Sequence, residues 1–505
     1  MSNSTPAGNA PAAPAARFDW RYWTCIWVEM LERLAYYTLR PVAAIYIMQA
    51  DDPGGLHLTA LQKGTIFFWW AVVQSLLPTF TGGLADRYGY RRTLALSLTL
   101  NTVGYLIMAG YHGYFGFMTG VIVMAVGTAF FKPALQGTLA HTVTKETSSV
   151  GWSIFYFIVN VGSFIGHMIT PVLLGPVALR TAMNWRYVFI ACAAFSFINL
   201  VSLLRFPSIP SGAPQDESLL AVIRRTIVNV FEPRLAAWLL IMSCFWMMMY
   251  QLWDLQPNFI EDWISSESIA RRMPFQSLVE TGPDGRLRVQ QQVLLSLNSI
   301  MIIIGVVPVG LLVAKMRTIS AMLFGMLGAT GGVLVAGLTQ NGWFLLAGIV
   351  LFSLGEMLTG PKKSEYLGLI APPGKKGLYL GYVNIPTGIG QGVGNLLAGW
   401  VYGRYGEKAT LALRYMVDHG LVPLKGEWDG RPSHLAEVTG VPRTEAFARL
   451  QELLGQGGPE VTRLLWDTYQ PQYHVWLPFA AIGIVAAIAL AIFGQMAKRW
   501  KDMNA

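Results

Sequence analysis

Apolar residues occur along this chain in long runs, each of about 20 residues or more, separated by polar stretches. About 20 apolar residues in an α-helix cross the ~30 Å of hydrocarbon in a lipid bilayer. The pattern therefore predicts an all-α membrane protein whose chain crosses the bilayer twelve times. The predicted spans are residues 21–48, 61–84, 93–112, 115–140, 150–175, 186–205, 235–262, 291–314, 319–338, 343–371, 377–402 and 475–497.

The composition agrees with this pattern. Hydrophobic residues make up 53% of the 505 residues and charged residues only 13%. An ordinary soluble domain carries about 25% charged residues, so the composition excludes a soluble protein. The net charge of +9 does not indicate nucleic-acid binding, because the basic residues lie in short loops between apolar runs. Lys and Arg in such loops set the orientation of a membrane protein.

The connections that follow the even-numbered spans carry most of these basic residues, for example Arg91 and Arg92, or Lys315 and Arg317. The positive-inside rule then places both termini in the cytoplasm. Segments rich in Ala and Gly indicate a bacterial inner membrane. A Pro- and Ser-containing stretch at 207–215 separates six spans from the next six, which predicts two six-helix halves around a shared site.

These observations divide the chain into six predicted segments. They are a disordered N-terminal tail (1–17), a first six-helix bundle (18–206), a cytoplasmic linker (207–232), spans seven to eleven (233–402), an extracytoplasmic insertion (403–474), and the last span with a cytoplasmic tail (475–505). Helical periodicity at 443–454 predicts that the insertion is a small helical cap. This cap either shapes access to the transport site or binds a ligand, or it has no role of its own.

The first span contains an unusual group of charges. Glu32, Arg33 and Arg40 follow Glu29 at offsets that place all four on one broad helical face, together with Tyr37. A Glu–Arg pair at membrane depth can simply fix helix packing. Two carboxylates and two guanidinium groups exceed that need, so a functional cavity is predicted. The proton affinity of the two carboxylates depends on whether Arg33 points at them or at a substrate, which is the elementary design of a proton-coupled switch.

Other spans hold isolated polar groups, which at this depth usually face a wet cavity or a partner. They are Lys132 in span four, Asp254 in span seven and Glu356 in span ten, with the amides Asn160 and Asn298. A Gly-Pro pair at 360–361 is expected to open the helix after Glu356. Lys362 and Lys363 follow it, either as gate residues or as the cytoplasmic end of the span. Cations in the first half and acids in the second predict a cavity suited to a zwitterion, such as a peptide or an amino acid.

Three stretches resemble known signatures. The loop GGLADRYGYRR at 82–92 resembles the cytoplasmic loop signature of the major facilitator superfamily. The stretch EMLERLAYY at 29–37 resembles the E-x-x-E-R-F-x-Y-Y motif of that superfamily's proton-dependent oligopeptide transporter family. The stretch FYFIVNVG at 155–162 resembles the F-Y-x-x-I-N-x-G signature of the same family. The resemblance implies the twelve-helix major facilitator fold and proton-coupled transport of small peptides.

The resemblance also implies roles for matching residues. Glu29, Glu32 and Arg33 match the proton-coupling triplet of the family, and Lys132 matches a cation linked to coupling and to the peptide carboxylate. Glu356 matches the acid that receives the peptide amino terminus. Further matches to residues that line the peptide cavity are Tyr37, Arg40, Tyr156, Asn160 and Asn298.

Four spans depart from the family pattern. Tyr250 and Gln251 follow Phe245-Trp246 where an acid is usual, and Asp254 lies one turn further along the same face. Val383 stands in place of a pocket tryptophan, Ser75 in place of a tyrosine, and Lys362 and Lys363 in place of apolar or small residues. These departures fall mainly in the half that would hold the substrate.

The leading interpretation is a proton-driven symporter that imports small peptides or a related zwitterion by alternating access. One alternative keeps the fold but carries or exports a different anion or metabolite, and another is a non-transporting receptor that uses the insertion. The sequence has no Walker-type loop, no metal-spaced His/Cys group and no Ser-His-Asp candidate, so an enzyme is not expected. We expect a monomer in the bilayer that uses the proton gradient, with no cofactor, metal or nucleic acid.

Overall fold

The computed structural model describes residues 18–144, 147–207, 228, 230–371, 379 and 381–499. The predicted disordered tail (1–17) and most of the predicted linker (207–232) lie outside the described residues.

The first half of the molecule is a bundle of long helices. Its elements are α1 (Trp20–Leu39), α2 (Ala43–Met48), α3 (Ala60–Leu76), α4 (Pro78–Tyr88), α5 (Tyr90–Gly110), α6 (Tyr114–Ala140), α7 (Ser148–Leu174), η1 (Val177–Leu179), α8 (Ala182–Ser202) and η2 (Leu203–Arg205).

The second half repeats this plan and adds two small features, a β-hairpin and a set of short helices. Its elements are α10 (Pro233–Met249), α11 (Gln251–Asp254), α12 (Gln256–Trp263), α13 (Glu267–Ala270), η3 (Gln276–Leu278), β1 (Val279–Thr281), β2 (Leu287–Val289), α14 (Gln291–Ala314), α15 (Thr318–Gly337), α16 (Gly342–Ile370), α18 (Asn384–Tyr405), α19 (Lys408–Asp418), η4 (Pro432–His434), α20 (Leu435–Thr439), η5 (Arg443–Glu445), α21 (Ala446–Leu454), α22 (Gly458–Tyr469) and α23 (Pro471–Arg499).

Each of the twelve predicted spans has a helical counterpart, but three are interrupted. Span one breaks into α1 and α2 around Pro41, span two into α3 and α4 at Pro78, and span seven into α10, α11 and α12, with Pro257 in the last. Proline has no N–H for the preceding turn and its ring crowds the carbonyl four residues back, so helices tend to restart there. The predicted opening of span ten after Gly360-Pro361 is wrong, because α16 continues without a break to Ile370.

Among the described residues, nine helices are long and apolar enough to cross a membrane. Helices α1, α3 and α18 are not among them: α1 carries the charged group of span one, α3 has only 17 residues, and α18 is rich in Gly and amide residues. Within these helices Arg33, Lys63 and Asn395 are buried against other helices and not exposed to lipid. Arg21 and Arg404, near the ends of α1 and α18, are exposed.

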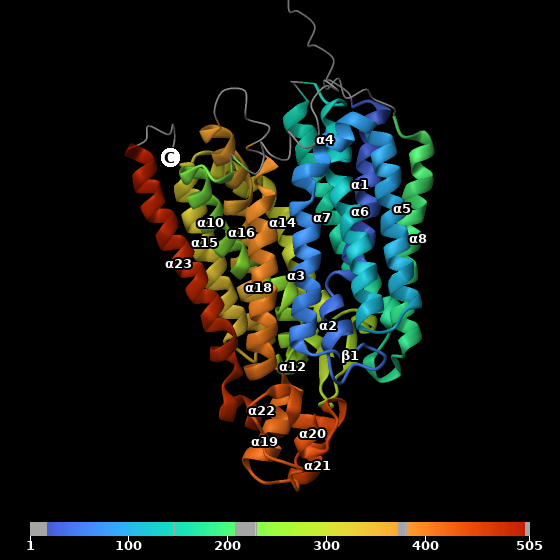
Figure 1. Ribbon diagram of the computed structural model, residues 1–505, viewed down its shortest axis with the longest axis vertical. Helices are drawn as coiled ribbons and strands as arrows, with labels where there is room; N and C mark the ends of the chain where they lie inside the picture. Colours follow the sequence, from blue (N-terminus) through green and yellow to red (C-terminus); the bar gives the residue numbers. More distant parts are fainter. Residues whose placement is uncertain are drawn as a thin grey trace, which may run out of the picture.

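The two halves stand side by side, as Figure 1 shows, and touch mainly through α3 with α18 and α7 with α14. The α3–α18 contact is close because glycine occupies it. A Cβ on Gly64 would lie 2.5 Å from the carbonyl oxygen of Asn395, and one on Gly399 would lie 2.6 Å from that of Ala60. Small residues permit such backbone approach between membrane helices.

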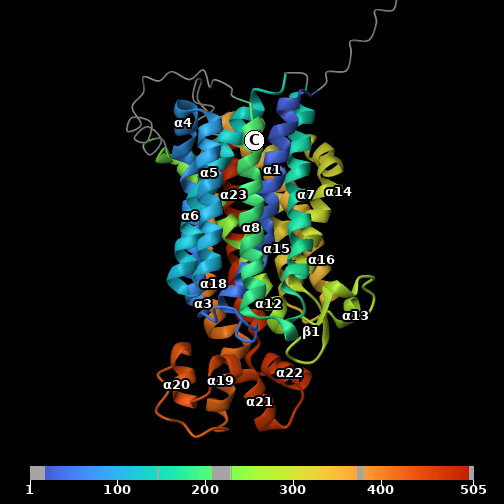
Figure 2. The same cartoon turned by 90° about the vertical axis from the view of Figure 1, so that its right-hand side faces the viewer.

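The start of α1 and the end of α23 lie at one end of the bundle, the termini end, and α19–α22 lie at the opposite end (Figures 1 and 2). Residues 406–470, between α18 and α23, form this cap, so the helical cap predicted at 403–474 is present with slightly narrower bounds. The cap is tied to the first half through Arg443, whose Nη2 donates to the carbonyl oxygens of His57 (2.6 Å) and Leu58 (2.9 Å). Arg443 also pairs with Glu407.

Candidate functional site

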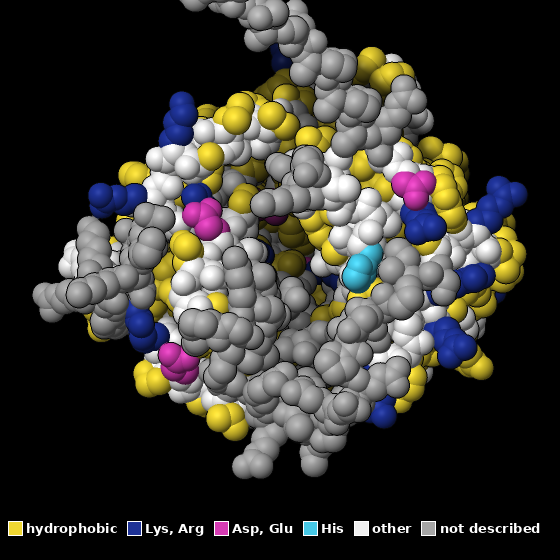
Figure 3. Space-filling view, turned by 90° about the horizontal axis from the view of Figure 1, so that it is seen from above, with side chains coloured by type: hydrophobic (Ala, Val, Ile, Leu, Met, Phe, Trp, Pro, Cys, Tyr) yellow, Lys and Arg dark blue, Asp and Glu magenta, His cyan; other side chains and the backbone are white. Residues whose placement is uncertain are grey.

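A cavity of about 310 Å³ lies between the two halves, lined from α1, α6 and α7 on one side and from α10, α14, α16 and α18 on the other. Seen from the termini end, the molecule is hollowed between its halves (Figure 3). All eight residues that the sequence predicts for substrate binding line this cavity: Arg33, Tyr37, Arg40, Lys132, Tyr156, Asn160, Asn298 and Glu356.

The two carboxylates of α1 stand just behind this lining. Glu29 and Glu32 are each 3% exposed, and Arg33, 4% exposed, is the member of the group that reaches the cavity. The Arg33 Nε lies 3.3 Å from Glu29 Oε1, and its Nη2 pairs with Glu32. One guanidinium therefore serves both carboxylates while its outer face is available to the cavity. Neutralising either carboxylate would loosen its hold on Arg33.

Lys132 is placed on α6, directly before Pro133, and is exposed on the cavity side. Within the part of the chain that the structure describes, its ammonium has no hydrogen bond and no ion pair. A lysine at membrane depth is costly unless it meets water or a partner. Because Lys132 lines the cavity, its ammonium can be hydrated there or can pair with an anionic group of a bound molecule.

Glu356 lies on the opposite side, on α16. Its Oε2 accepts a hydrogen bond of 2.9 Å from the Nδ2 of Asn298, which also donates to Ser353 Oγ at 3.0 Å. Asn298 is 2% exposed, so this amide fixes the carboxylate from within the bundle. The carboxylate makes no ion pair with a described residue, which leaves it free to receive a cationic group.

Lys362 and Lys363, which the sequence groups together as possible gate residues, separate in the structure. Lys362 is buried and pairs with Glu365 at 2.8 Å, away from the cavity lining. Lys363 lines the cavity, with its Nζ 4.1 Å from the centre of the Trp246 ring. The second half therefore presents a cation as well as an acid, and the expectation of a purely acidic wall is wrong.

Asp254, the other possible gate residue, lies behind the cavity lining, where it contacts the lining residues Arg40 and Gln391. It is fully buried and pairs with Arg40, so the two halves are joined there. Its Oδ2 also accepts from Asn395 Nδ2 (2.8 Å) and Gln391 Nε2 (3.2 Å) of α18. Arg40 is thus occupied by Asp254, although it also borders the cavity.

Sequence reasoning missed Lys63 on α3. This residue is 1% exposed, and its Nζ donates to the Asp254 carbonyl oxygen and to Asn258 Oδ1, both at 2.8 Å. The signal was a lone cation within the second apolar run, the same signal that singled out Lys132. Its position near the start of the run made it look like a helix end, whereas the fold buries that end against the second half.

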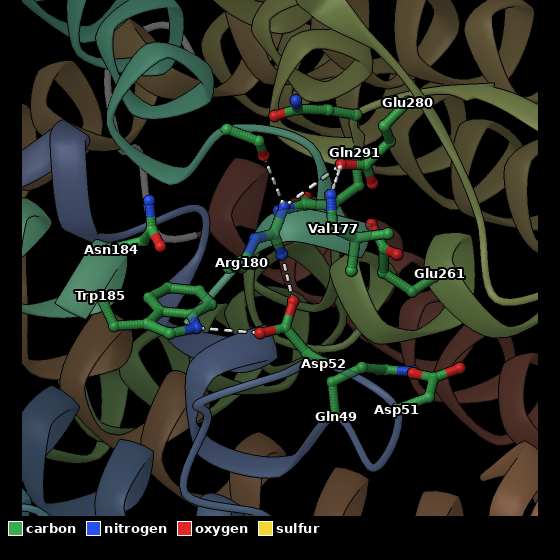
Figure 4. Close-up of polar contacts among 12 residues, drawn as sticks. Gln49, Asp51, Asp52, Val177, Arg180, Asn184, Trp185, Glu261, Glu280 and Gln291 are labelled. Carbon is green, nitrogen blue, oxygen red and sulfur yellow. Dashed lines mark hydrogen bonds and ion pairs between the residues drawn. The ribbon is translucent and has the colours of Figure 1, made fainter. Parts of the chain in front are cut away.

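Further from the cavity, a group of buried charges joins the two halves (Figure 4). Arg180, after η1 in the first half, pairs with Asp52. Its Nη2 lies 3.2 Å from Oε2 of Glu280, which belongs to β1 in the second half. Asp52 also accepts from the Trp185 indole at 2.9 Å, and Arg288 lies 2.8 Å from Glu280. Burial raises the pKa of the Asp52 carboxyl, and the Arg180 guanidinium opposes that rise. We refer to Asp52, Arg180, Glu280 and Arg288 as the Arg180 cluster.

The fold and the central cavity agree with a comparison against known families. A family model described as the Major Facilitator Superfamily matches residues 26–264 and 288–415, well over half of the chain. The chain belongs to the Major Facilitator Superfamily. It is accordingly an integral, multi-pass membrane protein, as the apolar pattern predicts.

Curated relatives of this superfamily member are transporters by name. The peptide transporter YePEPT of Yersinia enterocolitica is 30% identical over 153 residues, which are 29% of this chain and 30% of the relative. The uncharacterized transporter YclF of Bacillus subtilis is 28% identical over 185 residues, 35% of this chain and 36% of the relative. The matched region spans about a third of the length of these relatives. The predicted resemblance to the oligopeptide transporter family is confirmed over that region.

Solved structures extend the likeness of this superfamily member to almost the whole chain. A POT family transporter in complex with a thioalcohol-conjugated peptide has a TM-score of 0.65 at 14% identity, over 95% of this chain and 96% of the other. The nucleoside transporter NupG also has a TM-score of 0.65, at 11% identity, over 94% of this chain and 99% of the other. At such low sequence identity, structural likeness shows the fold alone. It confirms the predicted twelve-helix major facilitator architecture.

Proposed function

We propose that this chain is a proton-coupled symporter that imports small peptides or a related zwitterion by alternating access. The observation that carries the proposal is the arrangement of charge around the cavity. Arg33 and Lys132 face it from the first half and Glu356 faces it from the second, with Glu29 and Glu32 directly behind Arg33. A zwitterion can satisfy opposite charges on two halves at once and so draw them together.

The proton-coupled step follows from the position of Arg33. With both carboxylates ionised, the guanidinium is held by Glu29 and Glu32. Protonation of one carboxylate weakens that hold, and Arg33 then becomes available to a substrate carboxylate. The substrate amino group meets Glu356 on the other half. Binding of both ends favours closure of the termini end, and the halves then rock around the cavity.

Further parts of the proposal concern the setting. We place both termini in the cytoplasm of a bacterial inner membrane, so the hollow of Figure 3 opens inward and the Arg180 cluster closes the outer side. The basic loops after the even-numbered spans support this orientation. The transporter works as a monomer, with the proton gradient as its energy source and without a cofactor. Names of relatives, among them a peptide transporter, support a peptide cargo.

Transport by purified protein in proteoliposomes tests the proposal. An inward proton gradient should accumulate a labelled neutral dipeptide such as Ala-Ala, and dissipation of the gradient should abolish accumulation. Glu32→Gln should retain exchange of internal for external peptide but lose the response to the gradient, because its side chain cannot take up a proton. Glu267→Gln, at a partly exposed position of α13 outside the cavity lining, is the matched control and should behave as the unmodified protein. An undiminished gradient response in Glu32→Gln would contradict the coupling mechanism.

A second candidate is a carrier of another anion or metabolite on the same fold. The observation in its favour is Lys363, a cation on the wall that also holds Glu356. Competition of labelled dipeptide uptake by amino acids and by organic anions distinguishes the two candidates. Strong competition by simple organic anions and none by peptides would favour the second.

A further inference from the structure

Lys363 lines the cavity but forms no ion pair with a described residue. It lies on α16 seven residues after Glu356, two helical turns along the same face, which is a rise of about 10 Å. The two side chains make no ion pair with each other, so the attraction between their charges acts only at a distance. The described contact of its ammonium is the face of the Trp246 ring at 4.1 Å. An aromatic face attracts a cation without cancelling its charge.

Among the side chains that line the cavity and their ion-pair partners, the charges balance only because Lys363 is present; Lys63, which contacts the main chain of Asp254 and does not line the cavity, is outside this count. Eight ionisable side chains with charged forms at neutral pH line the cavity or pair with a residue that does. The cations are Arg33, Arg40, Lys132 and Lys363, and the carboxylates are Glu29, Glu32, Asp254 and Glu356. Uptake of one proton by the α1 carboxylates leaves a single net positive charge. Net charge enclosed away from water is costly, so a closed cavity favours contents that cancel it.

We propose that the cargo is a small zwitterion with a second anionic group, a net charge of −1, and that Lys363 selects it. This inference rests on the proposed function and specifies the substrate class of the same cavity. The amino group of such a cargo meets Glu356, its main-chain carboxylate meets Arg33 and Lys132, and its additional anion meets Lys363. A dipeptide with an acidic side chain is the simplest compound of this class.

The position of Lys363 permits this third contact. Glu356 and Lys363 belong to one continuous helix, so about two turns of α16 separate the site for the amine from the site for the side-chain anion. The carboxylate site lies across the cavity on α1 and α6. Three groups at three corners fix the orientation of the cargo as well as its charge. A neutral dipeptide would leave Lys363 without a counter-charge after closure.

Competition between two nearly isosteric peptides tests the inference. Ala-Glu and Ala-Gln differ in one ionised group, so their relative inhibition of labelled Ala-Ala uptake reports the value of that charge. We expect Ala-Glu to compete about tenfold better than Ala-Gln, the ordinary effect of a hydrogen bond to a charged group. Lys363→Met should remove this preference, and Lys363→Arg should keep it because the charge remains.

Lys362→Met is the matched control, since Lys362 is the neighbouring lysine of the same helix but pairs with Glu365 outside the cavity lining. It should retain the preference for Ala-Glu. Thermal unfolding of each variant separates lost selectivity from lost folding. Equal competition by the two peptides in the unmodified protein, or a preference that survives Lys363→Met, would overturn the inference and leave the proposed function intact. If the proton gradient drives uptake of neither the neutral nor the acidic dipeptides, both the proposed function and the inference are overturned.

Discussion

Replacing Arg180 by methionine removes the one guanidinium that joins Asp52 of the first half to Glu280 of the second. Methionine keeps most of the length of the side chain without its charge. Asp52 is 3% exposed and Glu280 is 4% exposed, so neither carboxylate reaches water while the cap end is closed. In this variant Glu280 still pairs with Arg288, whereas the Asp52 carboxylate keeps only the hydrogen bond from the Trp185 indole.

The expected magnitude follows from this loss. Removing one partner of a buried ion pair costs about 3–5 kcal/mol. Because Glu280 keeps the Val177 N–H and Arg288, which it shares with Glu261, we take the lower value of about 3 kcal/mol. Opening of the cap end would hydrate Asp52 and recover this cost, so the substitution should shift the balance toward the open cap end by about a hundredfold.

Distances between spin labels at the cap end measure this shift. Cysteines at Phe115 and Phe344, exposed at the start of α6 and α16, would place one label on each half after replacement of the half-buried Cys244. Arg180→Met should add a population with a longer distance. Arg271→Met is the matched control, because that arginine pairs with Glu267 at the surface. An unchanged distance distribution in Arg180→Met would refute the view that this cluster holds the cap end closed.

The pH dependence of the same variant has a definite sign. Burial raises the pKa of Asp52 in the closed end, so the closed end binds a proton more tightly than the open, hydrated end. Without Arg180 nothing described opposes this rise except the indole hydrogen bond. Acidification should therefore favour the closed end in Arg180→Met, and the long-distance population should shrink as the pH falls. A population that grows on acidification would contradict this sign.

Two further substitutions test the packing that frames the cavity. Arg443→Met should lower the midpoint of thermal unfolding, because it removes the ion-pair partner of Glu407 and the hydrogen bonds to the His57 and Leu58 carbonyl oxygens. Arg449→Met, at the cap surface, should change the midpoint little. Equal midpoints for the two variants would show that the cap is not tied to the first half through this residue. Gly390→Ala should destabilise the protein by about 1–3 kcal/mol, because its Cβ would meet the Ser243 carbonyl oxygen, whereas Gly360→Ala has open space and should be tolerated. Loss of stability in Gly360→Ala alone would contradict this account.

The sequence predicts much of the site because ionisable residues within apolar runs are conspicuous. Glu29, Arg33, Lys132 and Glu356 each break such a run, and the cost of charge in lipid forces each toward a cavity or a partner. Lys63 escaped the same reasoning because one-dimensional position does not distinguish a helix end in water from one buried by a neighbouring helix. The grouping of Lys362 with Lys363 failed for a related reason, since adjacent residues on a helix point about 100° apart.

The sequence by itself determined that the chain lies in a membrane, where most of its spans begin and end to within a few residues, and that the first span holds carboxylates and guanidinium groups on one face. Span eleven is an exception, since α18 begins at Asn384 and the prediction began at 377. These properties depend on local composition and on the period of a helix, which sequence records directly. Only the tertiary structure decided that Asp254 occupies Arg40, that Lys363 faces the cavity, and that Arg180 joins the two halves. Such pairings join residues far apart in the chain, and their partners are chosen by the packing of whole helices.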